Sequence, residues 1–109
     1  MKSYKILAIT EEGYDTGFRL AGCDVEMVEN EKDVVLILQK YIDEKIYGII
    51  IVDADLFYKI EEKKRRIFEE SLLPSIVPLN LKIKGKRDPG EYLKEVVRRV
   101  LGYSIRIKE

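Results

Sequence analysis

The side chains best suited to chemistry in this sequence are acids that follow expected strands. Glu11 and Glu12 come directly after the first apolar run, and Asp53 follows the most β-branched run of the chain. Parallel strands end at one edge of an α/β sheet, where ligands commonly bind. Three such acids would suit Mg²⁺ binding and phosphorylation, as in a phospho-receiver. That chemistry also needs a hydroxyl and a lysine on later strands, and neither has a convincing counterpart. The simpler interpretation is that Asp53 and Asp55 cap a helix.

Other catalytic chemistries lack their residues. The chain has no histidine and one cysteine, Cys23, which excludes Ser-His and Cys-His nucleophile systems and zinc sites built on these ligands. Gly13, Gly17 and Gly22 do not fit the spacing of a dinucleotide-binding loop, and the chain contains no GK[ST] motif. We interpret Cys23 as a small core residue. The sequence therefore predicts no catalytic residue, no cofactor and no metal.

Length and composition indicate one soluble domain. A chain of 109 residues with 46% hydrophobic and 37% charged residues buries roughly 65% of its unfolded surface. Its longest apolar run is far shorter than the roughly 20 residues of a membrane span. The N-terminus lacks the features of a signal peptide. We expect a cytoplasmic protein that is not inserted in a membrane.

Charge divides the chain into two parts. The net charge is zero, but residues 82–109 carry nine basic and four acidic side chains, a net charge of +5. Residues 1–81 therefore carry −5. We predict an α/β domain at 1–81, followed at 82–109 by a basic linker and a C-terminal helix that begins at the Asp88-Pro89 pair. An RNA-binding adaptor that uses the basic part is an alternative function.

The hydrophobic periodicity predicts alternating strands and helices. Strands are expected at 4–10, 24–28, 48–52 and 76–79, and helices at 17–21, 31–44 and 56–72. Helical crossovers require parallel strands. The predicted fold is a receiver-like (Rossmann-like) α/β fold with a four-stranded parallel sheet in the order 2-1-3-4. Strand 48–52 is expected to be central and 24–28 to lie at an edge.

Local features refine the three helices. Asp15 or Thr16 is expected to cap the first helix, and Gly22 to end it. Asn30 is the predicted cap of the second, whose apolar stripe contains Val34, Val35, Leu38, Tyr41 and Ile42. The third is predicted to be continuous over 56–72, with an apolar stripe of Phe57, Ile60, Ile67, Phe68 and Leu72 and a solvated charged face at 61–66.

The string TGFRLAG at residues 16–22 resembles the signature of the F subunit of V-type and archaeal A-type rotary ATPases. Weaker similarity continues through GIIIV at 48–52, PSIVP at 74–78 and RRVLGY at 98–103. The resemblance implies a receiver-like domain with a C-terminal helix. The Asp53-Ala54-Asp55 segment departs from the Thr/Ser-Glu helix start typical of that family at this point.

The resemblance also implies a function and its partners. Members of that family are non-catalytic central-stalk subunits of rotary ATPases and lie peripheral to the membrane. They help to couple ATP hydrolysis or synthesis to H⁺ or Na⁺ transport, and they stimulate ATPase activity. Their partners are the coiled-coil D subunit and, through the C-terminal helix, the A and B subunits of the catalytic ring. The expected interface residues here are Phe18, Arg19, Leu93, Val96, Val97, Arg98, Arg99 and Val100.

Several alternatives stay open at this point. Three other classes of function remain: a phospho-receiver-like signalling domain, an RNA-binding adaptor and a nucleotide-sensing module. A phosphoryl donor with Asp53→Asn tests the first, a salt-dependent shift with RNA the second, and a ligand-induced thermal shift the third. Phe18 is either a core residue or an interface anchor. The C-terminal helix either covers the sheet or docks on a neighbouring subunit. The sequence does not fix the direction of catalysis, the transported ion or the resting position of that helix.

Overall fold

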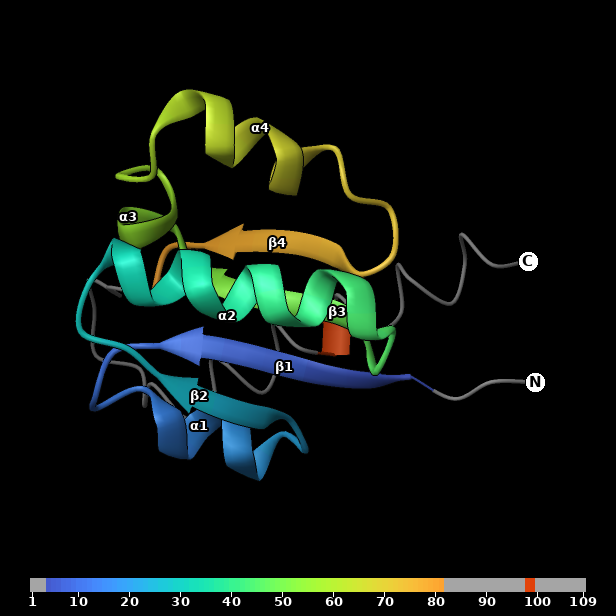
Figure 1. The fold of residues 1–109 in the computed structure, drawn as a ribbon. Coiled ribbons are helices and arrows are strands. Elements are labelled where there is room, and N and C mark those ends of the chain that lie inside the picture. Colours follow the sequence, from blue (N-terminus) through green and yellow to red (C-terminus); the bar gives the residue numbers. More distant parts are fainter. Residues whose placement is uncertain (1–3, 82–97, 100–109) are drawn as a thin grey trace.

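The structure, a computed structural model, describes residues 4–81 and 98–99 (Figure 1). The elements along the chain are β1 (Lys5–Thr10), α1 (Asp15–Leu20), β2 (Asp24–Met27), α2 (Glu31–Glu44), β3 (Tyr47–Asp53), α3 (Ala54–Phe57), α4 (Glu62–Glu69) and β4 (Ser75–Leu79). Most of the predicted linker and C-terminal helix lies outside the described residues. Arg98 and Arg99 are described, and both are helical and exposed.

The four strands form one parallel sheet in the order β2-β1-β3-β4, which confirms the predicted fold class and topology. Strand β3 pairs with β1 on one side and β4 on the other, so it is central as predicted. Strand β2 is an edge strand, and its side chains are half-buried or exposed. The carboxyl ends of β1 and β3 are level, because Ile9 lies opposite Val52.

Apolar side chains pack on both faces of the sheet. The larger core lies on the face covered by α2, α3 and α4, and its buried members include Leu7, Ile9, Val34, Leu38, Ile50, Val52, Phe57 and Phe68. The smaller core lies on the face of α1 and consists of Ala8, Phe18, Cys23, Ile49, Ile51 and Leu81. Residues 49–52 of β3 alternate between the two cores, as the two-residue period of a strand requires.

Helix α2 has the bounds that the sequence predicts. The Asn30 side chain accepts hydrogen bonds from the backbone N–H groups of Lys32 and Asp33, at 3.0 and 3.1 Å. Two otherwise unpaired donors at the helix start are thereby satisfied. The predicted apolar stripe is confirmed, because Val34 and Leu38 are fully buried and Val35, Tyr41 and Ile42 pack at the margin of the larger core.

The prediction of one continuous helix over 56–72 is wrong. The chain instead forms α3 and α4, separated by a turn in which Lys59 and Ile60 donate backbone hydrogen bonds to residues three positions earlier. This turn buries Ile60. Arg65 satisfies the carbonyl oxygens freed by the break, because its guanidinium donates to those of Tyr58 and Ile60 at 3.2 Å each. It also lies over the Tyr58 ring.

The break changes which side chains of this segment are buried. Ile67 and Leu72, predicted in the apolar stripe, are 64% and 91% exposed. The predicted charged face is confirmed by two ion pairs at helical spacing, Arg65 with Glu69 and Arg66 with Glu62. These exposed pairs each contribute about 0.3–0.5 kcal/mol at most.

Helix α1 starts earlier than predicted and without the predicted cap. Its N-cap residue is Tyr14, with no side-chain capping bond, and Asp15 instead forms an ion pair with Arg19 at 3.5 Å. Gly22 ends the helix region at φ +92°, a conformation in which a side chain would be strained, so the predicted stop is confirmed.

A Phe18→Ala substitution tests how far α1 depends on the core. Because Phe18 is fully buried, its truncation should lower the free energy of unfolding by about 3–5 kcal/mol. Leu20→Ala on the same short helix is the control, since Leu20 is 69% exposed and should change stability by less than about 0.5 kcal/mol. Urea unfolding of both variants checks this, and equal small losses would contradict the core role.

Candidate functional site

The carboxyl ends of the parallel strands form one edge of the sheet, the carboxyl edge. Among the residues described, Asp53 is the one acid at this edge that is fully buried, with 1% of its surface exposed. Its Oδ1 atom accepts a hydrogen bond from the backbone N–H of Asp55 at 3.0 Å, which confirms that Asp53 caps α3. Asp55 itself lies in the first turn of the helix and does not cap it. The second carboxyl oxygen of Asp53, Oδ2, is buried and has no hydrogen-bond partner.

The carboxyl edge brings Glu11 close to Asp53. Burial raises the pKa of the Asp53 carboxyl above its ordinary value, and the hydrogen bond from the Asp55 backbone opposes that rise. The nearby carboxylates of Glu11 and Asp55 raise the pKa further. Glu11 is half-buried, whereas Glu12 is exposed. Of the acids predicted at this edge, Glu11 therefore interacts electrostatically with Asp53, and Glu12 faces solvent.

The remaining reactive side chains support no catalytic arrangement in the part of the chain that the structure describes. Burial and the nearby Asp24 carboxylate raise the pKa of the Cys23 thiol to about 11, so the thiol stays protonated near neutral pH. Cys23 is a core residue as predicted. Residues 4–81 and 98–99 contain no group of three or more His, Cys, Asp or Glu side chains that could hold a metal ion.

The structure separates the two interface residues predicted on α1. Phe18 lies in the smaller core, so the core alternative for this residue is the one observed. Arg19 lies on the surface and pairs with Asp15. Leu20, which the sequence predicts to be held with Phe18 by packing on the sheet or by a partner, is exposed on α1. Arg98 and Arg99 are exposed. The other predicted interface residues, Leu93, Val96, Val97 and Val100, lie outside the described residues.

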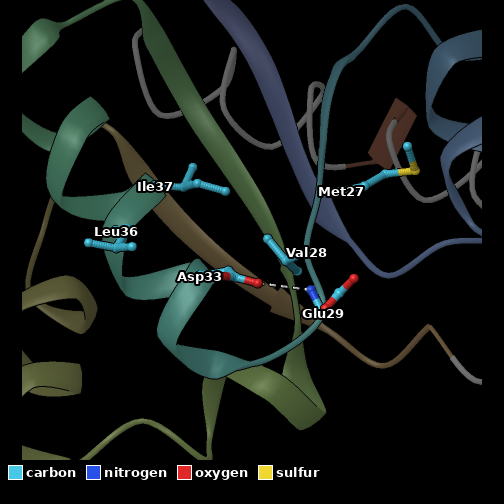
Figure 2. A pocket seen from close by; sticks show the side chains of 6 residues that line it. All are labelled: Met27, Val28, Glu29, Asp33, Leu36 and Ile37. Carbon is cyan, nitrogen blue, oxygen red and sulfur yellow. Dashed lines mark hydrogen bonds between the residues drawn. The ribbon is translucent and has the colours of Figure 1, made fainter.

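An open groove of about 400 Å³ lies between the end of β2 and the first half of α2 (Figure 2). Its lining residues are Met27, Val28, Glu29, Asp33, Leu36 and Ile37. Leu36 and Met27 stand at the two sides of the groove in Figure 2, with Val28 between them. Both are large apolar side chains exposed to solvent, at 66% and 52%. Such a pairing of exposed apolar residues and a hollow is typical of an interaction surface.

The corner from β2 into α2 shapes this groove. The backbone N–H of Glu29 donates to the Asp33 carboxylate at 3.1 Å, the bond drawn in Figure 2, and Asn30 caps the helix beside it. The lining contains two acids and no basic residue. Residues 24–44 as a whole carry seven acidic and two basic side chains. The groove therefore combines apolar side chains with two acids in its lining.

Sequence reasoning missed this groove, although one signal for it was present. Leu36 lies outside the apolar stripe of α2 and is therefore a large apolar residue on a face expected to be polar. Met27 gave no such signal, because its alternation with Glu26 is equally consistent with a half-buried strand.

These features define a small receiver-like α/β protein with a candidate docking surface. Residues 6–97 match the family model described as "ATP synthase (F/14-kDa) subunit". The F subunit of the A-type ATP synthase of Methanospirillum hungatei is 26% identical over 102 residues, covering 93% of this chain and 97% of that protein. The F subunit of the V-type ATP synthase of Thermus thermophilus is 28% identical over 94 residues, covering 84% and 89% of the two chains.

A solved structure agrees in fold. The crystal structure of the F subunit of the V-type ATP synthase of Archaeoglobus fulgidus superposes with a TM-score of 0.63 at 21% identity, covering 72% of this chain and all of that one. Because the family model matches most of the chain, the protein belongs to the family of F subunits of V-type and A-type ATP synthases. Among the residues that the structure describes, no helix has the length and apolar character needed to cross a bilayer.

The pH dependence of stability tests the environment of Asp53. A carboxyl whose pKa is raised by folding binds its proton more tightly in the folded state, so stability falls as pH rises from the unfolded pKa through the folded pKa. The Asp53→Asn variant retains a side-chain oxygen that can accept the hydrogen bond from the backbone N–H of Asp55. This variant should be more stable than the parent at pH 7, and the difference should vanish below about pH 3, where the carboxyl is protonated in both states. Chemical unfolding across pH checks this, and a parent that stays more stable at neutral pH would contradict it.

Proposed function

We propose that this protein is a non-catalytic rotor component of the central stalk of a rotary ATPase, on the cytoplasmic side of the membrane. In this role it joins the coiled-coil D subunit and helps to couple ATP hydrolysis or synthesis in the A and B ring to H⁺ or Na⁺ transport. It also stimulates ATPase activity through contacts of its C-terminal helix with the ring. Membership of the family supports this proposal.

The observation that carries the proposal is the apolar groove set in an acidic surface. A coiled coil presents long helices whose flanking positions are commonly charged. A helix with basic flanks and an apolar stripe would meet Leu36 and Ile37 with its apolar side chains and the acids around α2 with its cations. The groove lies beside β2, which is an edge strand of the sheet. The groove is thus the proposed docking surface for the shaft.

The other functions considered have less support. Phosphorylation of Asp53 requires an accessible carboxylate, and Asp53 is almost completely buried. The RNA-binding alternative relies on the basic residues 82–109, most of which lie outside the described residues, and within the described part α4 pairs Arg65 and Arg66 with glutamates. We therefore retain the rotor component as the proposed function.

Leu36→Lys should weaken binding of the coiled-coil partner. Leu36 is 66% exposed, so its replacement should change folding stability by no more than about 0.5 kcal/mol. Loss of an interface anchor should cost about 2 kcal/mol or more of binding free energy, roughly thirtyfold in Kd. Co-expression with the D subunit, then size exclusion and calorimetry, measures both quantities.

Ile67→Lys on α4 is the matched control. Ile67 has a similar exposure of 64% and does not line the groove. The control variant should bind like the parent protein. Equal weakening by the two substitutions, or unchanged binding of Leu36→Lys, would contradict the groove as the docking surface.

Truncation after Leu81 separates binding from stimulation. Leu81 belongs to the smaller core and is retained in the shortened chain. We expect the truncated protein to fold and bind the shaft, but to stimulate ATP hydrolysis less in the reconstituted complex.

Replacement of Arg98 and Arg99 by Glu should likewise reduce stimulation of ATP hydrolysis without unfolding the domain, since both side chains are exposed. Steady-state ATPase rates decide this, and full stimulation by either form would refute a role of the C-terminal helix.

A further inference from the structure

Helix α4 has few buried contacts with the rest of the protein. Of its eight residues, all of which the structure describes, Phe68 is the one that is buried, and it belongs to the larger core. Arg65 is half-buried, and the other six residues are exposed. Figure 1 shows the helix on the β4 side of the sheet. Since isolated helices shorter than roughly 12 residues are marginal in water, α4 depends on contacts outside its own backbone.

Arg65 connects α4 to the turn that precedes it. Its Nη1 atom donates hydrogen bonds to the carbonyl oxygens of Tyr58 and Ile60, at 3.2 Å each. Its Nε atom donates to the carboxylate of Glu69 within the helix at 2.9 Å. The guanidinium also lies 5.3 Å from the centre of the Tyr58 ring. Because hydrogen bonds from a charged donor are stronger than neutral ones, this side chain is a major attachment of the helix.

The chain on either side of α4 is fixed by other contacts. Before the helix, Ile60 is buried in the larger core. After it, the Ser71 hydroxyl donates to the carbonyl oxygen of Pro74 at 2.6 Å. The Lys45 ammonium, at the end of α2, donates to the carbonyl oxygen of Leu73 at 2.8 Å. The helix can therefore open while the sheet and the two flanking turns stay in place.

We propose that α4 unfolds locally while the sheet stays folded, and that the contacts of Arg65 with the turn at 58–60 set how often it does so. Local opening is the behaviour of elements that bury few apolar side chains. Opening would withdraw Phe68 from the larger core and uncover part of that core on the β4 side of the protein. The inference rests neither on the groove beside α2 nor on the rotor role.

Native-state hydrogen–deuterium exchange of the full chain tests the local opening. Amides of residues 66–69 in α4 report on the helix, and amides of β3 report on the sheet. Protection factors in α4 should be at least about tenfold lower than in β3. Low concentrations of urea should hardly change exchange in α4, because local opening exposes little surface. Equal protection and equal urea dependence in α4 and β3 would overturn the proposal.

Arg65→Met tests the attachment, since it removes the donors and keeps a long apolar side chain. Exchange in α4 should become at least about tenfold faster, because charged hydrogen bonds to two carbonyl groups are lost. Exchange in β3 should stay the same. Equal acceleration of α4 and β3 would contradict a local role of Arg65.

Arg66→Met is the matched control on the same helix. Arg66 is exposed and pairs with Glu62 one turn away, so its replacement should speed exchange in α4 by less than about threefold. Both substitutions remove one positive charge and have similar helix propensity. If Arg65→Met does not fold, Arg65→Lys is compared with Arg66→Lys, because lysine keeps the charge but lacks the planar fork. Equal effects at the two positions would overturn the assignment of Arg65.

Discussion

The structure depends on burying the central strand β3 on both of its faces. Alternate side chains of this strand enter two separate cores, with Ile50 and Val52 in one and Ile49 and Ile51 in the other. A parallel strand of this kind needs helices above and below the sheet. The right-handed crossovers place α1 on one face and α2 with α3 and α4 on the other. Strand β2 is left at an edge of the sheet (Figure 1). The groove lies between the end of β2 and the first half of α2.

The same constraint determines the chemistry of the carboxyl edge. Asp53 ends the buried strand, so its carboxylate is carried into the interior while it caps α3. Asp53 is buried because of its position at the end of this strand, although its side chain is polar. The unpaired oxygen of Asp53 and its proximity to Glu11 follow from the register of β1 and β3. The groove, by contrast, follows from the exposed side of α2, so the carboxyl edge and the groove arise from opposite properties of the fold.

Local signals allowed much of the fold to be predicted from sequence, and tertiary contacts explain what was missed. Helix α2 was predicted to the residue, because Asn30 caps it locally and its stripe has clear helical spacing. The break between α3 and α4 was not, because it depends on Arg65 satisfying carbonyl groups five and seven residues away and on burial of Ile60. For the sites, the acids after the strands were identified. The pairing of Glu11 with Asp53 and the exposure of Leu36 required the three-dimensional arrangement.

Hydrogen–deuterium exchange of the full chain, alone and in complex with the proposed coiled-coil D partner, tests whether the groove is the docking surface. If it is, complex formation should slow exchange in β2 and the first half of α2, where the groove lies. Amides of α4, including those around Ile67, should exchange at the same rate in both states. Protection confined to α4 and β4, with unchanged exchange in β2 and α2, would contradict the assignment of the groove as the docking surface for the shaft.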